Sequence, residues 1–342
     1  MNKKMSAKGG SASGGKRIVI IGGGTGTYTL LSGLKKYPAR LSVIVSTADD
    51  GGSTGILRKK LGVMPMGDIR QCLVGLSQAP EKLKQFFSYR FDKGPLKGHP
   101  FGNLYLAGLE LEKGSIGKAI YEAKRLLRAK GNIFPVTLKP TTLSAIYANG
   151  KKVIGEHKID EPKKIKNQKS KIKNLFLNPR LSANLDAIRA IKKANLIVFG
   201  PGDLHTSILP NLLAKGVPQA IKKSKAEKVF IINLMTRHGQ TEGFAASDFV
   251  KEFQKYLAGK IDYAIVNAKK PKRKWLLAYK AQGGEFVRPD INHFKKLGVK
   301  IIAKPLISEY LYQPSPGDKL KRSFLRHNSL KLARIIYDLA KS

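Results

Sequence analysis

The stretch that most constrains the fold is residues 17–27, which read Arg-Ile-Val-Ile-Ile-Gly-Gly-Gly-Thr-Gly-Thr. The apolar run at 18–21 is β-branched and too short for a helix, so it predicts a strand buried on both faces. Three glycines end this strand, and Thr25 is expected to cap the helix that follows. The chain is therefore expected to begin its fold as strand, glycine turn and helix.

This arrangement favours a bound phosphate, because glycines let the backbone approach closely and the helix start offers free N–H groups to an anion. The turn is not a P-loop, since no Lys-Ser/Thr follows the glycines. It also departs from the dinucleotide fingerprint, because Thr27 stands where the third glycine would be. We predict a phosphate site at residues 22–26, with a tight turn that binds nothing as the alternative.

Acidic turns follow further along the chain. Asp49 and Asp50 come after a second apolar strand and precede a Gly-Gly turn. Adjacent carboxylates at the end of a strand suit Mg²⁺ or sugar hydroxyls better than core packing. A solvated turn is the alternative. Asp68 is expected to cap a helix, which places it and Arg70 at another corner that faces a ligand.

Two later turns carry polar residues among glycines. His99 lies in a Gly- and Pro-rich loop, and Asn103 is expected to open the next helix; for this histidine, structural and functional roles are equally open. Residues 200–207 follow another short apolar strand and precede a helix. They are a second candidate phosphate turn, since hydroxyls and N–H groups gather at the helix start.

Strands alternating with helices predict the fold. Six strands are expected, at 18–21, 41–47, 196–199, 229–232, 261–266 and 299–303. Such alternation is typical of a parallel, doubly wound, Rossmann-like α/β sheet. The polar turns all follow strands, and open α/β sheets bind ligands at the carboxyl ends of their strands.

The chain is predicted to form a single domain of residues 17–342. Within it, residues 133–180 depart from the alternation of strands and helices. Short strands are expected there, two of them joined by Asn149-Gly150, which is a strong hairpin signal. This region is predicted to be a small antiparallel β subdomain inserted in the main sheet. The Lys-rich stretch at 151–173 is interpreted as a solvated basic excursion and not as a site.

Composition narrows the class of protein. The 342 residues include 64 Lys and Arg against 23 Asp and Glu, a net charge of +41. The lysines are scattered and no RNA-binding signature is present, so nonspecific polyanion binding stays an alternative function. Cys72 is the only cysteine, which excludes a disulfide within the chain. Residues 1–16 are expected to form a disordered basic tail, and no apolar run reaches the ~20 residues that span a bilayer. We expect a cytoplasmic protein without membrane insertion.

Taken in order, these turns resemble the CofD/YvcK superfamily. The motifs are Gly-Gly-Gly-Thr-Gly at 22–26, Ala-Asp-Asp-Gly-Gly-Ser-Thr-Gly at 48–55, Gly-Asp-Ile-Arg at 67–70, Gly-His at 98–99 with Gly-Asn-Leu at 102–104, Gly-Pro-Gly at 200–202, and Asn-Leu-Met-Thr at 233–236. One branch is 2-phospho-L-lactate transferase, which uses Mg²⁺, a nucleotide-activated donor and a deazaflavin. The other is the bacterial putative gluconeogenesis factor branch, which is associated with cell shape, cell-wall precursor supply and gluconeogenic growth, and which binds UDP-sugars. The segments at 49–55 and 61–68 are similar to the second branch.

The resemblance implies roles for particular residues. The glycine turn and residues 200–207 would face a diphosphate, Asn233 and Thr236 a nucleoside or sugar, and Arg326 the diphosphate. Asp203 and His205 stand where the branch more often has Ser and Tyr. The ligand-binding residues we expect are Gly22, Gly23, Gly24, Thr25, Gly26, Asp49, Asp50, Gly51, Gly52, His99, Asn103, Gly200, Gly202, Asp203, Thr206, Ser207, Asn233, Thr236 and Arg326.

The expected function is that of a binder and regulator more than an enzyme. The ligand would be a UDP-sugar such as UDP-N-acetylglucosamine, no cofactor would be required, and Asp49 and Asp50 would hold Mg²⁺ if an ion takes part. A protein partner in cell-wall precursor synthesis is implied, and a homo-oligomer is left open. The alternative is a transferase in which Asp49, Asp50 and Asp68 act in catalysis.

Overall fold

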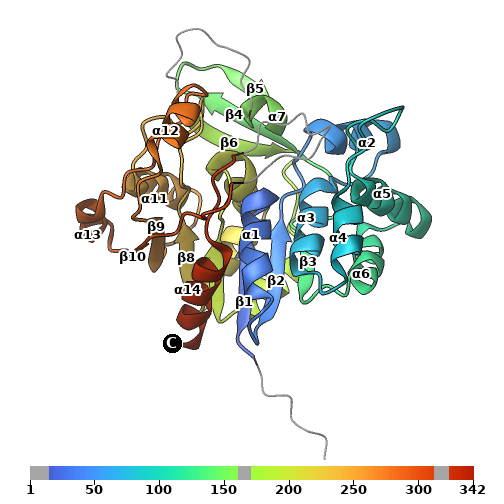
Figure 1. Cartoon of the computed structure of the whole chain (residues 1–342), viewed down its shortest axis with the longest axis horizontal. Helices are drawn as coiled ribbons and strands as arrows, with labels where there is room; N and C mark the ends of the chain where they lie inside the picture. Colours follow the sequence, from blue (N-terminus) through green and yellow to red (C-terminus); the bar gives the residue numbers. More distant parts are fainter. Residues whose placement is uncertain (1–14, 161–170, 312–322) are drawn as a thin grey trace, which may run out of the picture.

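The computed structural model describes residues 15–160, 171–311 and 323–342. Seven strands form one sheet in the order β10-β9-β8-β7-β1-β2-β3, and every neighbouring pair is parallel (Figure 1). The strands are β1 (Arg17–Ile21), β2 (Arg40–Val45), β3 (Asn132–Pro135), β7 (Leu196–Phe199), β8 (Glu227–Ile231), β9 (Tyr263–Asn267) and β10 (Lys300–Lys304). The strand order reverses between β1 and β7. That reversal is where open α/β sheets bind ligands, beyond the carboxyl ends of the strands.

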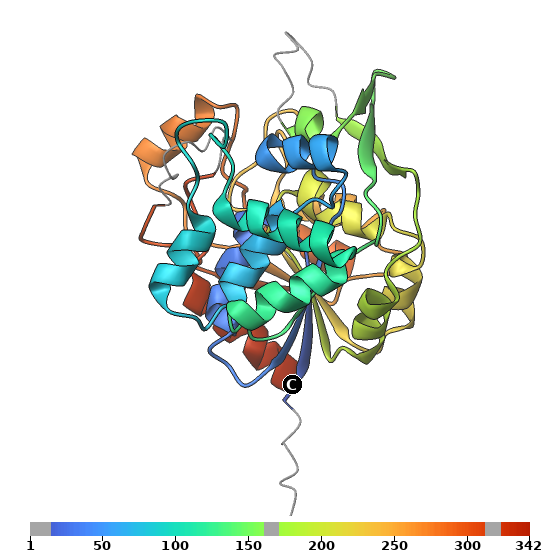
Figure 2. The same cartoon turned by 90° about the vertical axis from the view of Figure 1, so that its right-hand side faces the viewer.

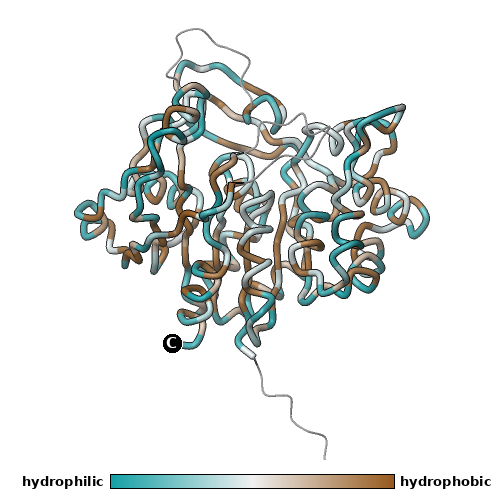
Figure 3. Tube along the Cα trace, in the orientation of Figure 1, coloured by the Kyte–Doolittle hydropathy of each residue, from teal (hydrophilic) through white to brown (hydrophobic). Residues whose placement is uncertain are grey.

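Strand β1 shows why the sheet is buried on both faces. Ile18 and Ile20 belong to one hydrophobic cluster, and Val19 and Ile21 belong to the other. Successive side chains of a strand point to opposite faces, so an unbroken β-branched run needs cover on both. Apolar segments accordingly follow the strands in the middle of the molecule, and polar segments gather at its periphery (Figure 3).

Helices supply this cover in two layers, which Figure 2 shows on either side of the strands. One layer contains α1 (Gly24–Leu34), α3 (Gly67–Leu76), α5 (Phe101–Lys113), α6 (Ile116–Leu126) and α14 (Ser329–Lys341). The other contains α8 (Leu185–Lys193), α9 (Leu209–Leu212), α10 (Val217–Lys223), α11 (Ala246–Gln254) and α13 (Phe294–Leu297). The remaining helices are α2 (Gly52–Leu61), α4 (Glu81–Ser88), α7 (Glu156–Asp160) and α12 (Arg273–Lys280). The predicted doubly wound sheet is confirmed.

A second, three-stranded antiparallel sheet has the order β5-β4-β6, with β4 (Thr142–Tyr147), β5 (Lys152–Ile154) and β6 (Ile172–Asn178). Strands β4 and β5 form the hairpin predicted from Asn149-Gly150, and Gly150 has the positive φ of 82° that such a turn favours. This sheet lies above the carboxyl ends of the parallel strands in Figure 1. The predicted subdomain of residues 133–180 is wrong at its start, because residues 132–135 form β3, at the edge of the parallel sheet.

Three predicted helix starts are wrong. Helix α1 begins at Gly24 with Gly23 at its N-cap, so Thr25 lies inside the first turn. Helix α3 begins at Gly67, and the carboxylate of Asp68 bonds to α1 instead of capping its own helix. Helix α5 begins at Phe101 with Pro100 at its N-cap, so Asn103 lies inside the helix, where its side chain bonds to Arg70 and Ser53. For Asp68 and Asn103 the cause is the same: a tertiary contact that the local sequence does not reveal takes the side chain away from the helix start.

The predicted N-terminal tail lies almost wholly in residues 1–14, outside the described residues. Within the described ranges, none of the helices combines the length and the apolar character that a bilayer crossing requires.

Candidate functional site at the carboxyl ends of the strands

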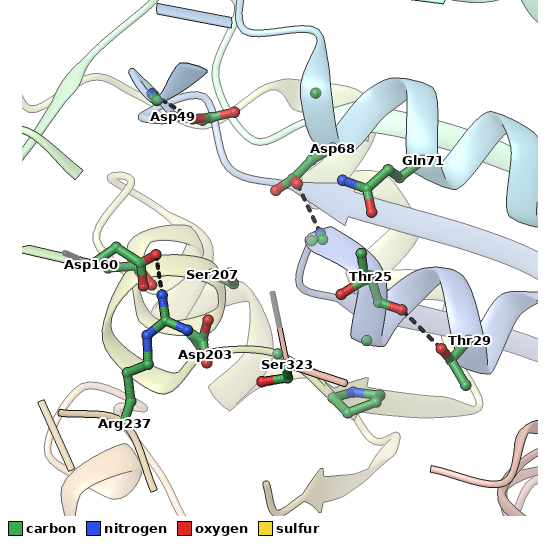
Figure 4. Close-up of a pocket in the computed structure, with 18 of the residues that line it drawn as sticks. Thr25, Thr29, Asp49, Asp68, Gln71, Asp160, Asp203, Ser207, Arg237 and Ser323 are labelled. Carbon is green, nitrogen blue, oxygen red and sulfur yellow. Dashed lines mark hydrogen bonds and ion pairs between the residues drawn. The ribbon is translucent and has the colours of Figure 1, made fainter. Parts of the chain in front are cut away.

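A polar cavity of about 210 Å³ opens where the strand order reverses. Its walls come from the turns after β1, β2, β7 and β8, from the starts of α3 and α5, from α7, and from the segment before α14. Figure 4 shows side chains from several of these elements pointing toward one space. Segments distant in sequence therefore meet at the place that the polar turns had indicated.

Most of the predicted site residues line this cavity. They are Gly23, Gly24, Thr25, Gly26, Asp49, Gly51, Asp68, Asn103, Gly202, Asp203, Thr206, Ser207, Asn233, Thr236 and Arg326. Whether each of them contacts a ligand stays a prediction.

Five predicted residues do not line the cavity: Gly22, Asp50, Gly52, His99 and Gly200. The amides of Gly22 and Gly200 extend the sheet ladder, since they donate to the carbonyls of neighbouring strands at 3.0 Å. Gly52 starts helix α2 with a φ of 45°. These three glycines hold backbone geometry behind the cavity wall.

The two glycine turns pack directly on each other. A methyl group at Gly26 would lie 2.4 Å from the carbonyl oxygen of Pro201, far inside van der Waals contact. A methyl group at Gly202 would lie 3.4 Å from the carbonyl oxygen of Gly23. Gly24 differs, because it has a φ of +70° and its missing side chain would point into open space. The close approach of two loops thus explains glycine at 26, and backbone conformation explains it at 24.

Asp68 occupies part of the predicted phosphate cradle. Its Oδ1 accepts a hydrogen bond of 2.8 Å from the Gly24 amide, the first amide of α1, as the dashed line in Figure 4 shows. A methyl group at Gly23 would lie only 1.8 Å from Asp68 Oδ2. A negative charge at a helix N-terminus is favourable. A phosphate bound here would therefore share the helix start with a carboxylate.

A chain of buried hydrogen bonds holds Arg70 at the cavity wall. Arg70 Nε donates to Asn103 Oδ1 at 2.9 Å, and Asn103 Nδ2 donates to Ser53 Oγ at 3.2 Å. Ser53 Oγ in turn lies 2.8 Å from His99 Nδ1. Burial lowers the pKa of His99, and the charges of Arg90 and Lys60 add to this shift. His99 thus supports the arginine from behind the wall.

Acidic side chains gather at the cavity in spite of the basic composition. Asp49, Asp68, Glu156, Asp160 and Asp203 all line it. Burial raises the pKa of Glu156 well above the ordinary value for a glutamate, and the charges of Asp49, Asp160, Asp50 and Asp68 raise it further. Strongly shifted carboxyl groups in a cleft mark candidate functional sites.

The predicted Mg²⁺ pair does not form one site. Asp49 faces the cavity, whereas Asp50 Oδ1 accepts a hydrogen bond of 2.8 Å from the amide of His157. Its Oδ2 lies against Gly155, where a methyl group would be 2.8 Å away. In the described part of the chain, no group of three or more His, Cys, Asp or Glu side chains is arranged to hold a metal ion. The geometry does not fit an ion shared by Asp49 and Asp50.

The interpretation of 151–173 as outside the site is wrong for its first half. Glu156, His157 and Asp160 of α7 line the cavity, because the small sheet carries this helix over the strand ends. Asp160 is paired with Arg237 at 2.5 Å, which ties α7 to the turn after β8 (Figure 4). Acidic residues within this Lys-rich stretch, such as Glu156 and Asp160, were the feature of the sequence that could have indicated a role at the site.

Sequence reasoning also missed a wall made late in the chain. Tyr279, Leu325 and His327 line the cavity beside Arg326. The Tyr279 hydroxyl accepts a hydrogen bond of 3.2 Å from the Leu325 amide, and burial is the main cause that raises the pKa of this tyrosine. No local motif marks these positions, so only the fold brings them together.

Asp203 and His205, the two departures from the family pattern, face different ways. Asp203 lines the cavity, whereas His205 is 1% exposed and lies behind it, with Nε2 3.7 Å from Glu252 Oε1. Burial raises the pKa of Glu252, but His205 and Lys255 outweigh it, so the net shift is downward. His205 thus belongs to a buried pair beneath the turn.

Comparison with known proteins identifies the family. The CofD family, described as 2-phospho-L-lactate transferase, matches residues 18–307. A putative gluconeogenesis factor of Thermotoga maritima is 40% identical over 95% of this chain and 99% of its own. The gluconeogenesis factor of Bacillus subtilis is 36% identical over 95% and 98%. A crystal structure of a Bacillus halodurans protein superposes with a TM-score of 0.86 at 37% identity, covering 94% of this chain and 99% of that one. The chain therefore belongs to the CofD family, within the branch of gluconeogenesis factors.

Proposed function

We propose that the chain binds a UDP-sugar such as UDP-N-acetylglucosamine in this cavity. Binding would regulate the flow of carbon into cell-wall precursors during gluconeogenic growth, with an effect on cell shape and through a protein partner in precursor synthesis. The observation that carries the proposal is the meeting of phosphate-type and nucleoside-type groups in one cavity. Helix-start amides and Arg326 suit a diphosphate, and the buried acceptors Asn233 Oδ1 and His327 Nε2 suit a nucleoside or sugar.

The position of the cavity supports the same conclusion. It lies at the reversal of strand order between β1 and β7, where Rossmann-like sheets hold nucleotides. The gluconeogenesis factor name of the relatives links the family to gluconeogenic growth. A regulator that senses a product of sugar synthesis needs a site for that product and no catalytic group of its own.

Calorimetric titration tests the proposal directly. UDP-N-acetylglucosamine, GTP and NADP would each be added to the purified full chain at fixed ionic strength. We expect saturable binding of the uridine ligand and much weaker binding of the other two. No heat and no change in thermal unfolding with any UDP-sugar at millimolar concentration would refute it. Affinity that falls steeply with salt for every polyanion alike would instead support the polyanion alternative.

Arg326→Ala tests the phosphate part of the site. Loss of a charged hydrogen bond costs about 1.5–3 kcal/mol, so affinity should fall roughly 10- to 100-fold. Arg334→Ala is the matched control, since Arg334 lies on α14 and its side chain is 79% exposed. An Arg326→Ala affinity within twofold of wild type would remove this residue from the site.

A transferase is the second candidate, because the family description names 2-phospho-L-lactate transferase and because Asp49 and Asp68 line the cavity. The chain would be incubated with Mg²⁺ and either UDP-N-acetylglucosamine or GTP, with and without a deazaflavin acceptor. Intact ligand after hours supports a binding protein. Turnover that disappears in Asp49→Asn would establish the transferase.

A further inference from the structure

The wall before α14 holds a histidine with one unengaged ring nitrogen. His327 lines the cavity and is 7% exposed. The backbone around it is fixed: His327 forms a β-bridge with Ile307, and the Asn328 amide donates to the Leu306 carbonyl at 2.6 Å. The ring therefore sits in a defined place at the cavity.

The hydrogen bonds of this ring define its tautomer. The carbonyl of Ile232 accepts a hydrogen bond from the ring, and Nε2 is buried without a hydrogen-bond partner in the described part of the chain. Nδ1 must then be the donor to Ile232, because a carbonyl can only accept. Nε2 of the neutral ring is left as an acceptor.

The ring stays neutral near physiological pH. Burial lowers the pKa of His327 to about 4; the hydrogen bond to Ile232 opposes this shift and the charge of Arg326 adds to it. A protonated ring would offer a second donor at Nε2, whereas the neutral ring offers only a lone pair. The wall thus presents an uncharged acceptor next to a cation.

Asn233 presents a second acceptor on the same side. It follows β8 directly after Ile232, lines the cavity, and its Oδ1 is buried without a partner among the described residues. A buried acceptor that finds no donor costs about 1–3 kcal/mol. Two such acceptors on one cavity wall call for an explanation, and donors on a ligand supply one.

We infer that His327 Nε2 accepts a hydrogen bond from the nucleoside or sugar part of the ligand, and so selects ligands that carry an N–H or O–H donor there. This inference rests on the proposed function, since it assigns one contact within that same site. The donor is either the imide N–H of the uracil base or a hydroxyl of the attached sugar. A diphosphate alone carries neither group, so its affinity should not depend on the His327 ring.

Two substitutions separate the two nitrogens. In His327→Asn the amide nitrogen can still donate to Ile232, but the acceptor at Nε2 is lost. In His327→Gln the longer side chain can place an amide oxygen near the position of Nε2. The control is His293→Asn, at a histidine whose side chain is 61% exposed. Thermal unfolding of each variant shows whether it is folded.

Affinities for UDP, N3-methyl-UDP, UDP-N-acetylglucosamine and inorganic pyrophosphate would be measured by calorimetry near pH 7.5. We expect His327→Asn to bind UDP-N-acetylglucosamine at least tenfold more weakly than wild type and pyrophosphate within twofold. His327→Gln should bind UDP-N-acetylglucosamine at least threefold more tightly than His327→Asn does.

If the base is the donor, wild type binds N3-methyl-UDP at least tenfold more weakly than UDP, and His327→Asn binds both alike. If the sugar is the donor, the loss in His327→Asn appears with UDP-N-acetylglucosamine and not with UDP.

A measurement on the wild-type chain covers the case in which His327→Asn does not fold. The ¹⁵N resonance of an unprotonated imidazole nitrogen moves upfield when it accepts a hydrogen bond, so the His327 Nε2 signal should move on addition of UDP-N-acetylglucosamine and not on addition of pyrophosphate. An unmoved signal, or an affinity of folded His327→Asn for UDP-N-acetylglucosamine within twofold of wild type, would overturn the inference and leave the proposed function intact. Equal weakening in both His327 variants would indicate a structural role and overturn it as well. Absence of uridine binding in wild type would overturn both.

Discussion

The glycine turns and the C-terminal wall line the same cavity, but different forces hold them in place. The turns after β1 and β7 are backbone structures, fixed by the close approach of Gly26 to Pro201 and by the bond between Asp68 and Gly24. The C-terminal wall, formed by Tyr279 and residues 325–327 with Asn233 beside them, is made of side chains. Asn233 Oδ1 and His327 Nε2 are each buried there without a partner in the described residues. The first region is sensitive to added volume and the second to added charge.

Lowering the pH should therefore destabilise the folded protein through the C-terminal wall, where His327 is buried as a neutral ring. The unfolded His327 ring titrates near 6.5 and the folded ring at about 4, so the unfolded chain binds more protons between these values. Stability rises with pH across this window, and the contribution is lost as pH falls from 6.5 to 4. The shift corresponds to roughly 3 kcal/mol. Denaturant unfolding at several pH values should show this slope in wild type, and His327→Gln should lack that part of it. Parallel slopes for the two proteins would contradict the burial of a neutral ring.

Added volume should break the glycine turns. Gly26→Ala places a methyl group 2.4 Å from a backbone carbonyl of the other turn, and overpacking of this kind costs about 2 kcal/mol. Gly108→Ala in α5 is the matched control, because nothing lies within 4 Å of the added methyl group. That control should gain up to about 1 kcal/mol from helix propensity. If both variants unfold at the wild-type denaturant concentration, the loop–loop packing does not limit stability.

Removing a carboxylate should distinguish the two turns from each other. Asp68→Ala leaves the Gly24 amide without its acceptor and the start of α1 without its negative charge, at a cost of about 1–2 kcal/mol. Asp203 is the N-cap residue of the helical turn Leu204–Ile208 after β7, but its side chain makes no capping hydrogen bond. Asp203→Ala should therefore change stability by less than about 0.5 kcal/mol. The free energy of unfolding of both variants would be measured in urea. A larger loss in Asp203→Ala than in Asp68→Ala would contradict the role of Asp68 at the start of α1.

The acidic group on α7 should give the smallest effect. The folded pKa of Glu156 is raised, so the folded chain binds more protons than the unfolded chain, and this side chain destabilises increasingly as pH rises past 4.5. Glu156→Gln should therefore stabilise the protein at pH 7, and by less at pH 4. A gain that is the same at both pH values would exclude a charge effect.

Much of the fold was predictable because its signals are local. The β-branched run at 18–21 needs two covered faces, and the Asn149-Gly150 turn needs a hairpin, whatever the rest of the chain does. The polar turns after the strands pointed to the correct edge of the sheet, since parallel strands bring their carboxyl ends together. These features follow from backbone geometry and the period of the side chains.

The tertiary structure decided which groups share the cavity. It moved Asp68 from its own helix to the start of α1, turned Asp50 away from Asp49, and set His99 behind Arg70. It also brought Glu156 and His327 to the site from segments without a motif. Short-range preferences fix where strands and turns form, whereas side-chain partners and protonation depend on burial and on charges brought close only when the whole chain has packed.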